Sequence, residues 1–190
     1  MSESPIEFDP ATALIVVDVQ NDFADPTGSL YVDGGERVVT EVNNLIAAAL
    51  QANSFVVFTQ DWHPATTDHF KQWPVHCVQG TWGAELHPAL AARSPVVQTG
   101  VHGEDGYSGF TAHDLDRDED VPTALEPLLR SHDVSTVVVC GLAEDYCVKE
   151  TVLDARRLGF NTVVPLRATA AVADADAACK AMEAAGAVMV

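Results

Sequence analysis

Positive charge is scarce in this 190-residue chain. It carries 10 Lys and Arg residues against 28 Asp and Glu residues, which gives a formal net charge of −18. Because phosphate groups repel such a surface, the composition argues against nucleic acid and anionic membrane as partners. Apolar runs long enough to cross a bilayer are also missing. The first ten residues are acidic and lack the basic and apolar regions of a signal peptide, so we expect a cytoplasmic protein.

Cysteine and aromatic residues are sparse as well. The four cysteines are widely spaced and form no CxxC pair, which predicts free thiols rather than a disulfide framework. Hydrophobic residues make up 47% of the chain and aromatic residues 7%, as is usual in globular α/β proteins. The length suffices for one domain with a substantial core, and we predict a single domain over residues 1–190.

Short apolar segments alternate with helical patterns along the chain. Continuous apolar strands predict a parallel sheet that is covered on both faces, and the alternation with helices predicts a doubly wound α/β fold. The carboxyl ends of the strands then share one edge, where such folds bind ligands. Two long connections, residues 62–95 and 100–120, are expected to be functional. The expected strands are residues 13–18, 54–61, 96–99, 136–140, 162–165 and 187–190, and the expected helices are residues 36–52, 121–131, 148–158 and 174–185.

One cysteine lies at a strand-to-helix junction. Cys147 follows a β-branched strand, a glycine and a short acidic turn, and a helical pattern begins beside it. Converging N–H groups and the helix dipole favour an anion there, which suits a nucleophilic thiolate; a small buried thiol is the alternative. Asp18 and Asp61 end two other strands at the same edge. A carboxylate near the thiol could act as its base, while a turn or N-cap role is the alternative for each aspartate.

Histidines follow Asp61 closely, at His63, His69 and His76. One carboxylate with two or three imidazoles suits zinc, iron or manganese and leaves positions for water or substrate. Solvated or hydrogen-bonded loop histidines are the alternative. Aromatic residues in or beside the long loops could stack on a planar substrate or pack as a lid. These aromatic residues are Phe23, Trp73, Tyr107, Phe110 and Tyr146.

Five motifs occur in one order along most of the chain. They are residues 16–23 (VVDVQNDF), 61–64 (DWHP), 73–80 (WPVHCVQG), 107–110 (YSGF) and 141–148 (GLAEDYCV). With them the chain resembles the nicotinamidase/pyrazinamidase group of the isochorismatase-like cysteine hydrolases, from about residue 13 to beyond residue 165. The resemblance implies a three-layer α/β/α fold around a sheet of about six strands. It also implies hydrolysis of a small-molecule amide, nicotinamide, to nicotinate and ammonia through a thioester, by a monomer or a homo-oligomer.

The resemblance also implies roles for individual residues. Cys147 matches the nucleophile and Asp18 the carboxylate that takes its proton and passes it to the departing ammonia. The backbone N–H groups of Ala143 and Cys147 match an oxyanion hole, with a cis peptide bond between Leu142 and Ala143. Asp61, His63 and His76 match the ligands of a divalent metal, with zinc expected first and iron or manganese as alternatives; His69 matches an additional ligand of some members. The metal would hold the pyridine nitrogen, Phe23 and Trp73 would flank the ring, and Tyr107 and Tyr146 match positions near the pocket.

One position departs from the family pattern. Members carry a catalytic lysine at the end of the strand before residues 107–110, and here that position is Thr99. A lysine ammonium would stabilise the thiolate and the developing oxyanion, and threonine carries no charge. Three interpretations stay open: Lys71 or Arg93 supplies the charge, the protein is a slower amidase or acts on another small amide, or it is a binding protein without the chemistry. Residues 100–106 (GVHGEDG) are expected to reshape the pocket mouth.

Overall fold

The computed structural model of the chain describes residues 6–93 and 95–190. Its centre is a sheet with the strand order β3-β2-β1-β6-β7-β9, and β8 pairs with β6 beside this path. All of these pairings are parallel, so the predicted parallel α/β sheet is confirmed. The strands are β1 (Thr12–Val17), β2 (Phe55–Asp61), β3 (Val96–Thr99), β6 (Thr136–Leu142), β7 (Asn161–Val164), β8 (Thr169–Ala170) and β9 (Val188–Met189).

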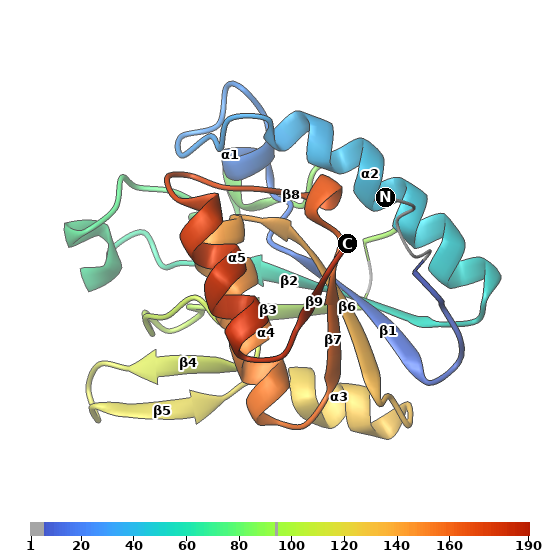
Figure 1. Cartoon of the computed structure of the whole chain (residues 1–190). Coiled ribbons are helices and arrows are strands. Elements are labelled where there is room, and N and C mark those ends of the chain that lie inside the picture. Colours follow the sequence, from blue (N-terminus) through green and yellow to red (C-terminus); the bar gives the residue numbers. More distant parts are fainter. Residues whose placement is uncertain (1–5, 94) are drawn as a thin grey trace.

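Helices cover both faces of the sheet, as Figure 1 shows. In β1, Leu14 and Val16 pack into the cluster on the α2 side, whereas Ile15 and Val17 pack into the cluster on the opposite side. This burial on both faces is the reason why the strands read as continuous apolar runs, and it confirms the three-layer architecture. One layer holds α1 (Asn21–Ala24) and α2 (Gly35–Gln51), and the other holds α3 (Leu125–Ser131), α4 (Lys149–Arg157) and α5 (Ala175–Ala184).

A two-stranded antiparallel hairpin lies at the side of the sheet and was not predicted (Figure 1). Its strands are β4 (Thr111–Asp114) and β5 (Glu119–Pro122). Both strands are polar and at least partly exposed along their length, so they lack the apolar alternation that announces a strand. The predicted helix over residues 121–131 is therefore wrong at its start: residues up to Pro122 pair with β4, and α3 begins only at Leu125.

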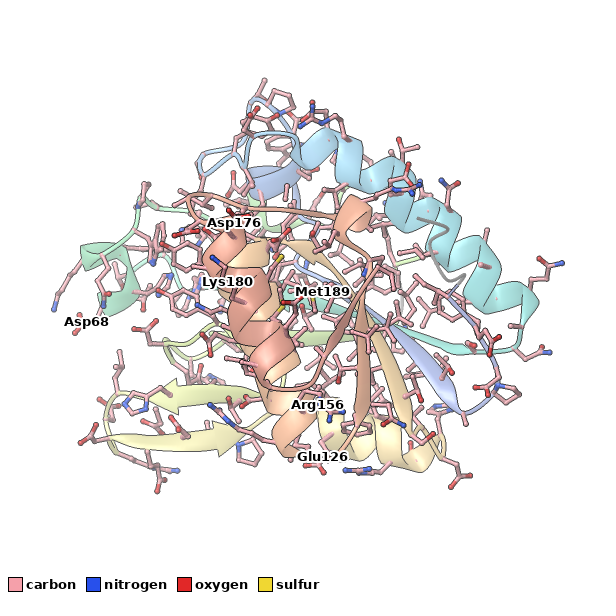
Figure 2. The ribbon with its side chains drawn as sticks, viewed as in Figure 1. Asp68, Glu126, Arg156, Asp176, Lys180 and Met189 are labelled. Atoms are coloured by element: carbon pink, nitrogen blue, oxygen red, sulfur yellow. The ribbon has the colours of Figure 1, made fainter. Side chains whose placement is uncertain are left out.

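Short helical turns make up much of the remaining chain, and charged side chains populate the outer surface. Asp176 and Lys180 are exposed on α5, and Asp68 lies on a turn far from the sheet (Figure 2). No described helix has both the length and the apolar character that crossing a membrane requires. All four cysteines are free thiols, as predicted. The turns are η1 (Asp68–Lys71), η2 (Trp82–Ala84), the π-helical η3 (Glu144–Val148) and η4 (Leu166–Ala168).

The strand order places the candidate site residues in a row at one sheet edge. Asp61 stands beside Thr99 in the register between β2 and β3. Val17 stands beside Gly141 in the register between β1 and β6, so Asp18 and Ala143 come just after the ends of those strands. Across the edge the order is therefore Thr99, Asp61, Asp18 and Ala143, with Cys147 in the turn that follows.

Candidate active site and metal centre

The structure brings Cys147 and Asp18 together. Cys147 lies in η3, just after β6, and is 8% exposed. One carboxylate oxygen of Asp18, one of Asp61 and the sulfur of Cys147 lie within 4.8 Å of one another, and all three residues are buried. Asp18 has φ 47°, in the left-handed region, and its Oδ1 accepts a hydrogen bond from Thr59 Oγ1 at 2.7 Å. The Leu142–Ala143 peptide bond is cis, as the resemblance implied.

The electrostatics of this pair differ from the sequence-based expectation. Burial, together with the negative charges of Asp18 and Asp61, raises the pKa of the Cys147 thiol well above its usual value. Burial and the neighbouring Asp61 also raise the pKa of Asp18. This direction is opposite to the one expected from the strand-to-helix junction alone, because desolvation and two nearby carboxylates outweigh the N–H groups of the turn. Ionisation of this thiol is therefore favoured by a base or by a compensating charge.

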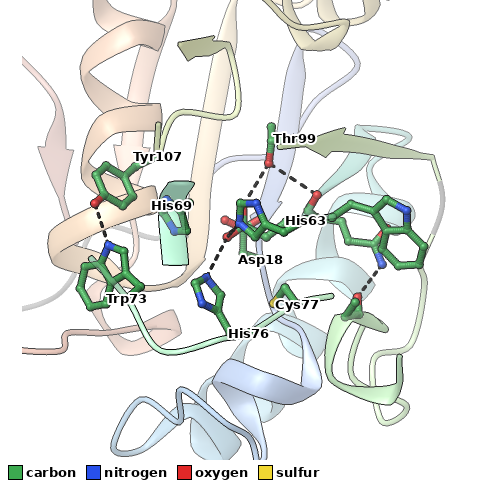
Figure 3. Close-up of polar contacts among 12 residues, drawn as sticks. Asp18, His63, His69, Trp73, His76, Cys77, Thr99 and Tyr107 are labelled. Carbon is green, nitrogen blue, oxygen red and sulfur yellow. Dashed lines mark hydrogen bonds and ion pairs between the residues drawn. The ribbon is translucent and has the colours of Figure 1, made fainter. Parts of the chain in front are cut away.

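Three histidines converge beside this pair. One ring nitrogen from each of His63, His69 and His76 lies within 4.8 Å of the others, and all three side chains are buried. Asp61 Oδ2 lies 3.5 Å from His63 Nε2 and 3.9 Å from His76 Nε2. Nitrogen and oxygen ligands of a tetrahedral zinc ion lie about 3.4 Å apart, since each is about 2.1 Å from the metal. Figure 3 shows the three imidazoles gathered in front of Asp18.

The hydrogen bonds of these histidines leave nitrogen lone pairs free for a metal. Nδ1 of His69 lies 2.7 Å from Asp105 Oδ1, and Nδ1 of His76 lies 2.7 Å from the carbonyl oxygen of Pro74. Both partners only accept, so each Nδ1 carries its proton and each Nε2 keeps a lone pair. Burial lowers the pKa of His76, which favours the neutral imidazole.

His63 gives further support for a metal ion at this cluster. Both of its ring nitrogens are buried without a hydrogen bond. Buried polar atoms are rarely left unpaired in folded proteins. A metal ligated by His63 would satisfy one of them, so the donor set of one carboxylate and three imidazoles fits a divalent metal ion.

Thr99 lies at this edge, but its hydroxyl contacts Asp61. Thr99 Oγ1 donates to Asp61 Oδ1 at 3.1 Å. Neighbouring strands are about 4.8 Å apart, so β3 and β1 are separated by roughly 9.6 Å and a threonine side chain on β3 reaches only the strand next to it. A lysine at this position could extend past Asp61 toward Asp18. Thr99 therefore takes the lysine position in sequence without contacting the nucleophile.

Neither of the two cations suggested as substitutes reaches the site. The side chain of Lys71 is 73% exposed, and its Nζ pairs with Asp68 Oδ1 at 2.7 Å. Arg93 is also exposed. Within residues 6–93 and 95–190, the ion pairs given for the Asp61 carboxylate are with His63 and His76. The interpretation that Lys71 or Arg93 replaces the lysine is therefore wrong.

A pocket opens in front of Cys147. Of the five aromatic residues expected near a substrate, Phe110 packs in the core instead, and the other four, Phe23, Trp73, Tyr107 and Tyr146, line the pocket. Trp73 Nε1 donates to the hydroxyl of Tyr107 at 2.9 Å (Figure 3). The rings of Trp73 and Tyr146 meet edge-on, with centroids 5.0 Å apart. The walls are mostly aromatic and aliphatic, while a thiol, a carboxylate and two imidazoles face the pocket. The lining residues are Phe23, Leu30, Val32, Asp61, His69, Trp73, His76, Tyr107, Ala143, Tyr146, Cys147 and Val172.

Sequence reasoning missed several residues that support the site. The side chain of Gln20 holds the backbone of Asp61 at both its N–H and its carbonyl, at 2.9 and 2.7 Å. The carboxylate of Asp22 accepts from the backbone N–H of Cys77 at 2.7 Å and so ties the histidine loop to α1. Both residues directly follow the first apolar strand, where the argument that placed Asp18 at the sheet edge also applied to them.

Asp145 is a third supporting residue, in the turn that carries Cys147. Its carboxylate accepts hydrogen bonds of 2.8 to 3.0 Å from the backbone N–H groups of Val172, Ala173 and Asp174. Val172 lines the pocket. The turn that positions the thiol therefore also holds one wall of the pocket, a connection that spans 27 residues and leaves no local signal.

Comparisons with known proteins identify the family and the fold of this chain. The Isochorismatase domain matches residues 12–190. A nicotinamidase/pyrazinamidase of Mycobacterium tuberculosis is 40% identical over 180 residues, which cover 90% of this chain and 92% of that protein. The solved structure of PnC1 from L. infantum in complex with nicotinate superposes with a TM-score of 0.87 at 38% identity, over 97% of this chain and 95% of the other. A pyrazinamidase of Pyrococcus horikoshii in complex with zinc gives a TM-score of 0.85 at 34% identity, over 95% and 99%. The chain belongs to the isochorismatase family.

Proposed function

We propose that the protein is a metal-assisted cysteine amidase that converts nicotinamide to nicotinate and ammonia. The observation that carries this proposal is the close approach of the Cys147 sulfur and an Asp18 carboxylate oxygen, within 4.8 Å, at an aromatic pocket that Asp61 and two of the histidines also line. The related proteins support the substrate, since they are named nicotinamidase/pyrazinamidase or hold nicotinate, and the match extends over nearly the whole of each.

In the first half of the proposed reaction, Asp18 takes the thiol proton as the sulfur of Cys147 attacks the carboxamide carbon. A sulfur–carbon bond forms, and the carbonyl oxygen becomes an oxyanion that the backbone N–H groups of Ala143 and Cys147 stabilise. The carbon–nitrogen bond then breaks. Asp18 returns its proton to the departing nitrogen, which leaves as ammonia, and a thioester on Cys147 remains.

In the second half, water replaces ammonia. Asp18 takes a proton from a water molecule that attacks the thioester carbon, and the same N–H groups stabilise the second oxyanion. The carbon–sulfur bond breaks, Asp18 reprotonates the sulfur, and nicotinic acid is released, which gives its proton to ammonia or water and becomes nicotinate. The raised pKa of Asp18 suits these exchanges, because a carboxylate with an elevated pKa both accepts and returns a proton readily.

A divalent metal would be held by Asp61, His63, His76 and His69, and zinc is supported by the related pyrazinamidase complex. A bound ion of this kind supplies Lewis acidity and a fixed point for the pyridine nitrogen. Phe23 and Trp73 would flank the ring, and Tyr107 and Tyr146 would close the aromatic wall. Orienting the ring in this way presents the carboxamide carbon to Cys147.

Because position 99 holds threonine and not lysine, we expect a lower rate of nicotinamide turnover. No lysine or arginine is among the described residues that line the pocket, so the negative charge that develops on sulfur and oxygen lacks a cationic side chain in the pocket wall. Removing one preorganised electrostatic group from an active site typically costs on the order of a hundredfold in rate. We therefore expect turnover of nicotinamide to be slow compared with family members that carry the lysine.

The direct test measures ammonia release from nicotinamide by zinc-loaded protein and by its Cys147→Ala variant. We expect release by the unaltered protein and none by Cys147→Ala. Cys179→Ala is the matched control, since it removes a thiol that lies outside the pocket lining. No release from nicotinamide or pyrazinamide would contradict the substrate assignment, and activity retained in Cys147→Ala would contradict the mechanism.

A second candidate function follows from the same threonine. A member without the cation could act on another small amide, or bind nicotinamide without hydrolysing it. A panel of small carboxamides tests the first case, since one of them would then be hydrolysed faster than nicotinamide. Tight nicotinamide binding, a Cys147 unreactive toward thiol reagents and no ammonia would identify the second case.

A further inference from the structure

A carboxylate from a distant part of the chain holds His69 from behind. Asp105 Oδ1 lies 2.7 Å from His69 Nδ1, and the two residues are 36 positions apart in sequence. The side chain of His69 is 4% exposed and that of Asp105 is 23% exposed, so the pair is largely shielded from water. Because an ionised carboxylate only accepts, the bond fixes the proton on Nδ1 and leaves Nε2 as the nitrogen for a metal.

Asp105 is itself fixed by the backbone around it. Its N–H donates to the carbonyl oxygen of His113 at 2.9 Å, and its own carbonyl oxygen accepts from the N–H of His113 at 2.7 Å. Oδ1 of Asp105 also accepts from the N–H of Gly106 at 2.8 Å. His113 belongs to β4, so the unpredicted hairpin of β4 and β5 anchors the loop that carries this carboxylate.

The same loop also contacts a second histidine. Gly100 has φ +70°, and a Cβ atom built on it would lie 2.6 Å from Nδ1 of His63. Residues 100–106 therefore form the outer wall for two of the three imidazoles: a glycine makes room for His63, and a carboxylate binds His69.

We propose that Asp105 is a positioning residue of the metal centre, whose hydrogen bond to Nδ1 holds the His69 ring in the orientation and tautomer in which Nε2 binds the ion. This inference rests on the metal site proposed above at Asp61, His63, His69 and His76. A carboxylate behind a ligating histidine fixes the ring and increases the basicity of the ligating nitrogen. The hairpin thereby contributes to metal affinity without touching the substrate.

The first test compares Zn²⁺ affinities of metal-free protein by competition with a chromophoric chelator. Asp105→Ala and Asp105→Ser are expected to bind Zn²⁺ about 10- to 100-fold more weakly, the usual effect of losing such an outer carboxylate. Serine keeps a polar group for the Gly106 N–H but is too short to reach His69. Asp105→Asn keeps an acceptor oxygen of the same reach, so its affinity should stay closer to that of the unaltered protein.

Asp120→Ala is the matched control on the same hairpin. Asp120 Oδ1 lies 2.9 Å from Nδ1 of His113, an exposed histidine outside the metal cluster. This variant removes one carboxylate bonded to a histidine, as Asp105→Ala does, and its Zn²⁺ affinity should not change. Thermal unfolding of each metal-free variant shows whether it is folded under the conditions of the titration.

A second readout reports on the ring itself. Nitrogen-15 NMR of the metal-free protein should show His69 protonated at Nδ1, and Asp105→Ser should lose that preference while remaining folded. If the role of Asp105 were purely structural, Asp105→Ser would lower thermal stability without changing the tautomer of His69 in the folded fraction.

The outcomes distinguish the positioning role of Asp105 from the metal site itself. Zn²⁺ affinity equal to that of the unaltered protein in both Asp105→Ala and Asp105→Ser overturns the positioning role and leaves the metal site intact. Unaltered protein that takes up no Zn²⁺ overturns the metal site and the positioning role with it. If Asp105→Ala does not fold, Asp105→Ser and the NMR measurement decide.

Discussion

Thr99 donates a hydrogen bond to Asp61, with 3.1 Å between its Oγ1 and Oδ1 of the carboxylate. The other oxygen, Oδ2, is the one that lies near His63 and His76. The residue at the lysine position of the family thus orients a candidate metal ligand, while the described residues that line the pocket around Cys147 include no lysine or arginine.

Introducing the missing charge is expected to increase the rate. In Thr99→Lys the longer side chain can pass Asp61 and bring an ammonium toward Asp18 and Cys147, which favours the thiolate and the oxyanion. We expect kcat/KM for nicotinamide to rise by about tenfold or more. Thr99→Met, similar in length but uncharged, should give no such increase. Equal rates in both variants would show that charge at this position does not limit the reaction.

Removing only the hydroxyl of Thr99 tests its bond to Asp61. Thr99→Val keeps the shape of the side chain and loses the donor. We expect Zn²⁺ affinity to fall by roughly tenfold, since partners of ligating carboxylates help to orient them. Chelator competition measures the change. Thr66→Val, on the loop beyond the metal cluster, serves as the control and should bind Zn²⁺ as the unaltered protein does.

Gly100 should not tolerate a side chain. In Gly100→Ala the new Cβ meets the ring of His63 at 2.6 Å, and the φ of +70° adds backbone strain. Gly80→Ala is the control for the backbone alone, since Gly80 has φ +74° and nothing within 4 Å of a built Cβ. We expect Gly80→Ala to lose about 1 kcal/mol of unfolding free energy, and Gly100→Ala to lose more and to bind Zn²⁺ weakly. Similar Zn²⁺ affinities in the two variants would show that the His63 ring can move away from the new Cβ without weakening Zn²⁺ binding.

Asp145 should give the protein a pH-dependent part of its stability. Burial opposes its ionisation, but hydrogen bonds from the N–H groups of Val172, Asp174 and Ala173 outweigh burial and lower the pKa of this carboxyl. A carboxyl with a lowered folded-state pKa stabilises the protein above its unfolded-state pKa of about 3.9, and this contribution is lost as pH falls through the folded-state value.

Asp145→Asn should therefore lower the free energy of unfolding by about 1 to 2 kcal/mol at pH 7. The difference from the unaltered protein should shrink once the pH falls below about 4. Urea unfolding at several pH values measures this difference in the free energy of unfolding. Asp176→Asn changes the charge equally on the exposed first turn of α5 and should have little effect at any pH. If the difference in unfolding free energy between Asp145→Asn and the unaltered protein does not depend on pH, the stabilisation does not come from the ionised carboxylate.

The sequence by itself determined the parallel sheet and most of the candidate site. Asp18 directly follows the apolar strand β1 and Asp61 ends the apolar strand β2, so one short segment shows both the strand and the functional residue. Cys147 is similar, because a strand, a glycine and a helical pattern frame it on either side.

Only the tertiary structure decided how these residues are supported and charged. The bonds from Asp105 to His69, from Thr99 to Asp61 and from Asp145 to Val172 join residues 36, 38 and 27 positions apart. No periodicity records such pairs, because each forms only when separate strands and loops meet. The raised pKa of Cys147 has the same origin. A strand-to-helix junction can be read from the chain, but the burial and the two carboxylates that raise the pKa of the thiol exist only once three strands lie side by side.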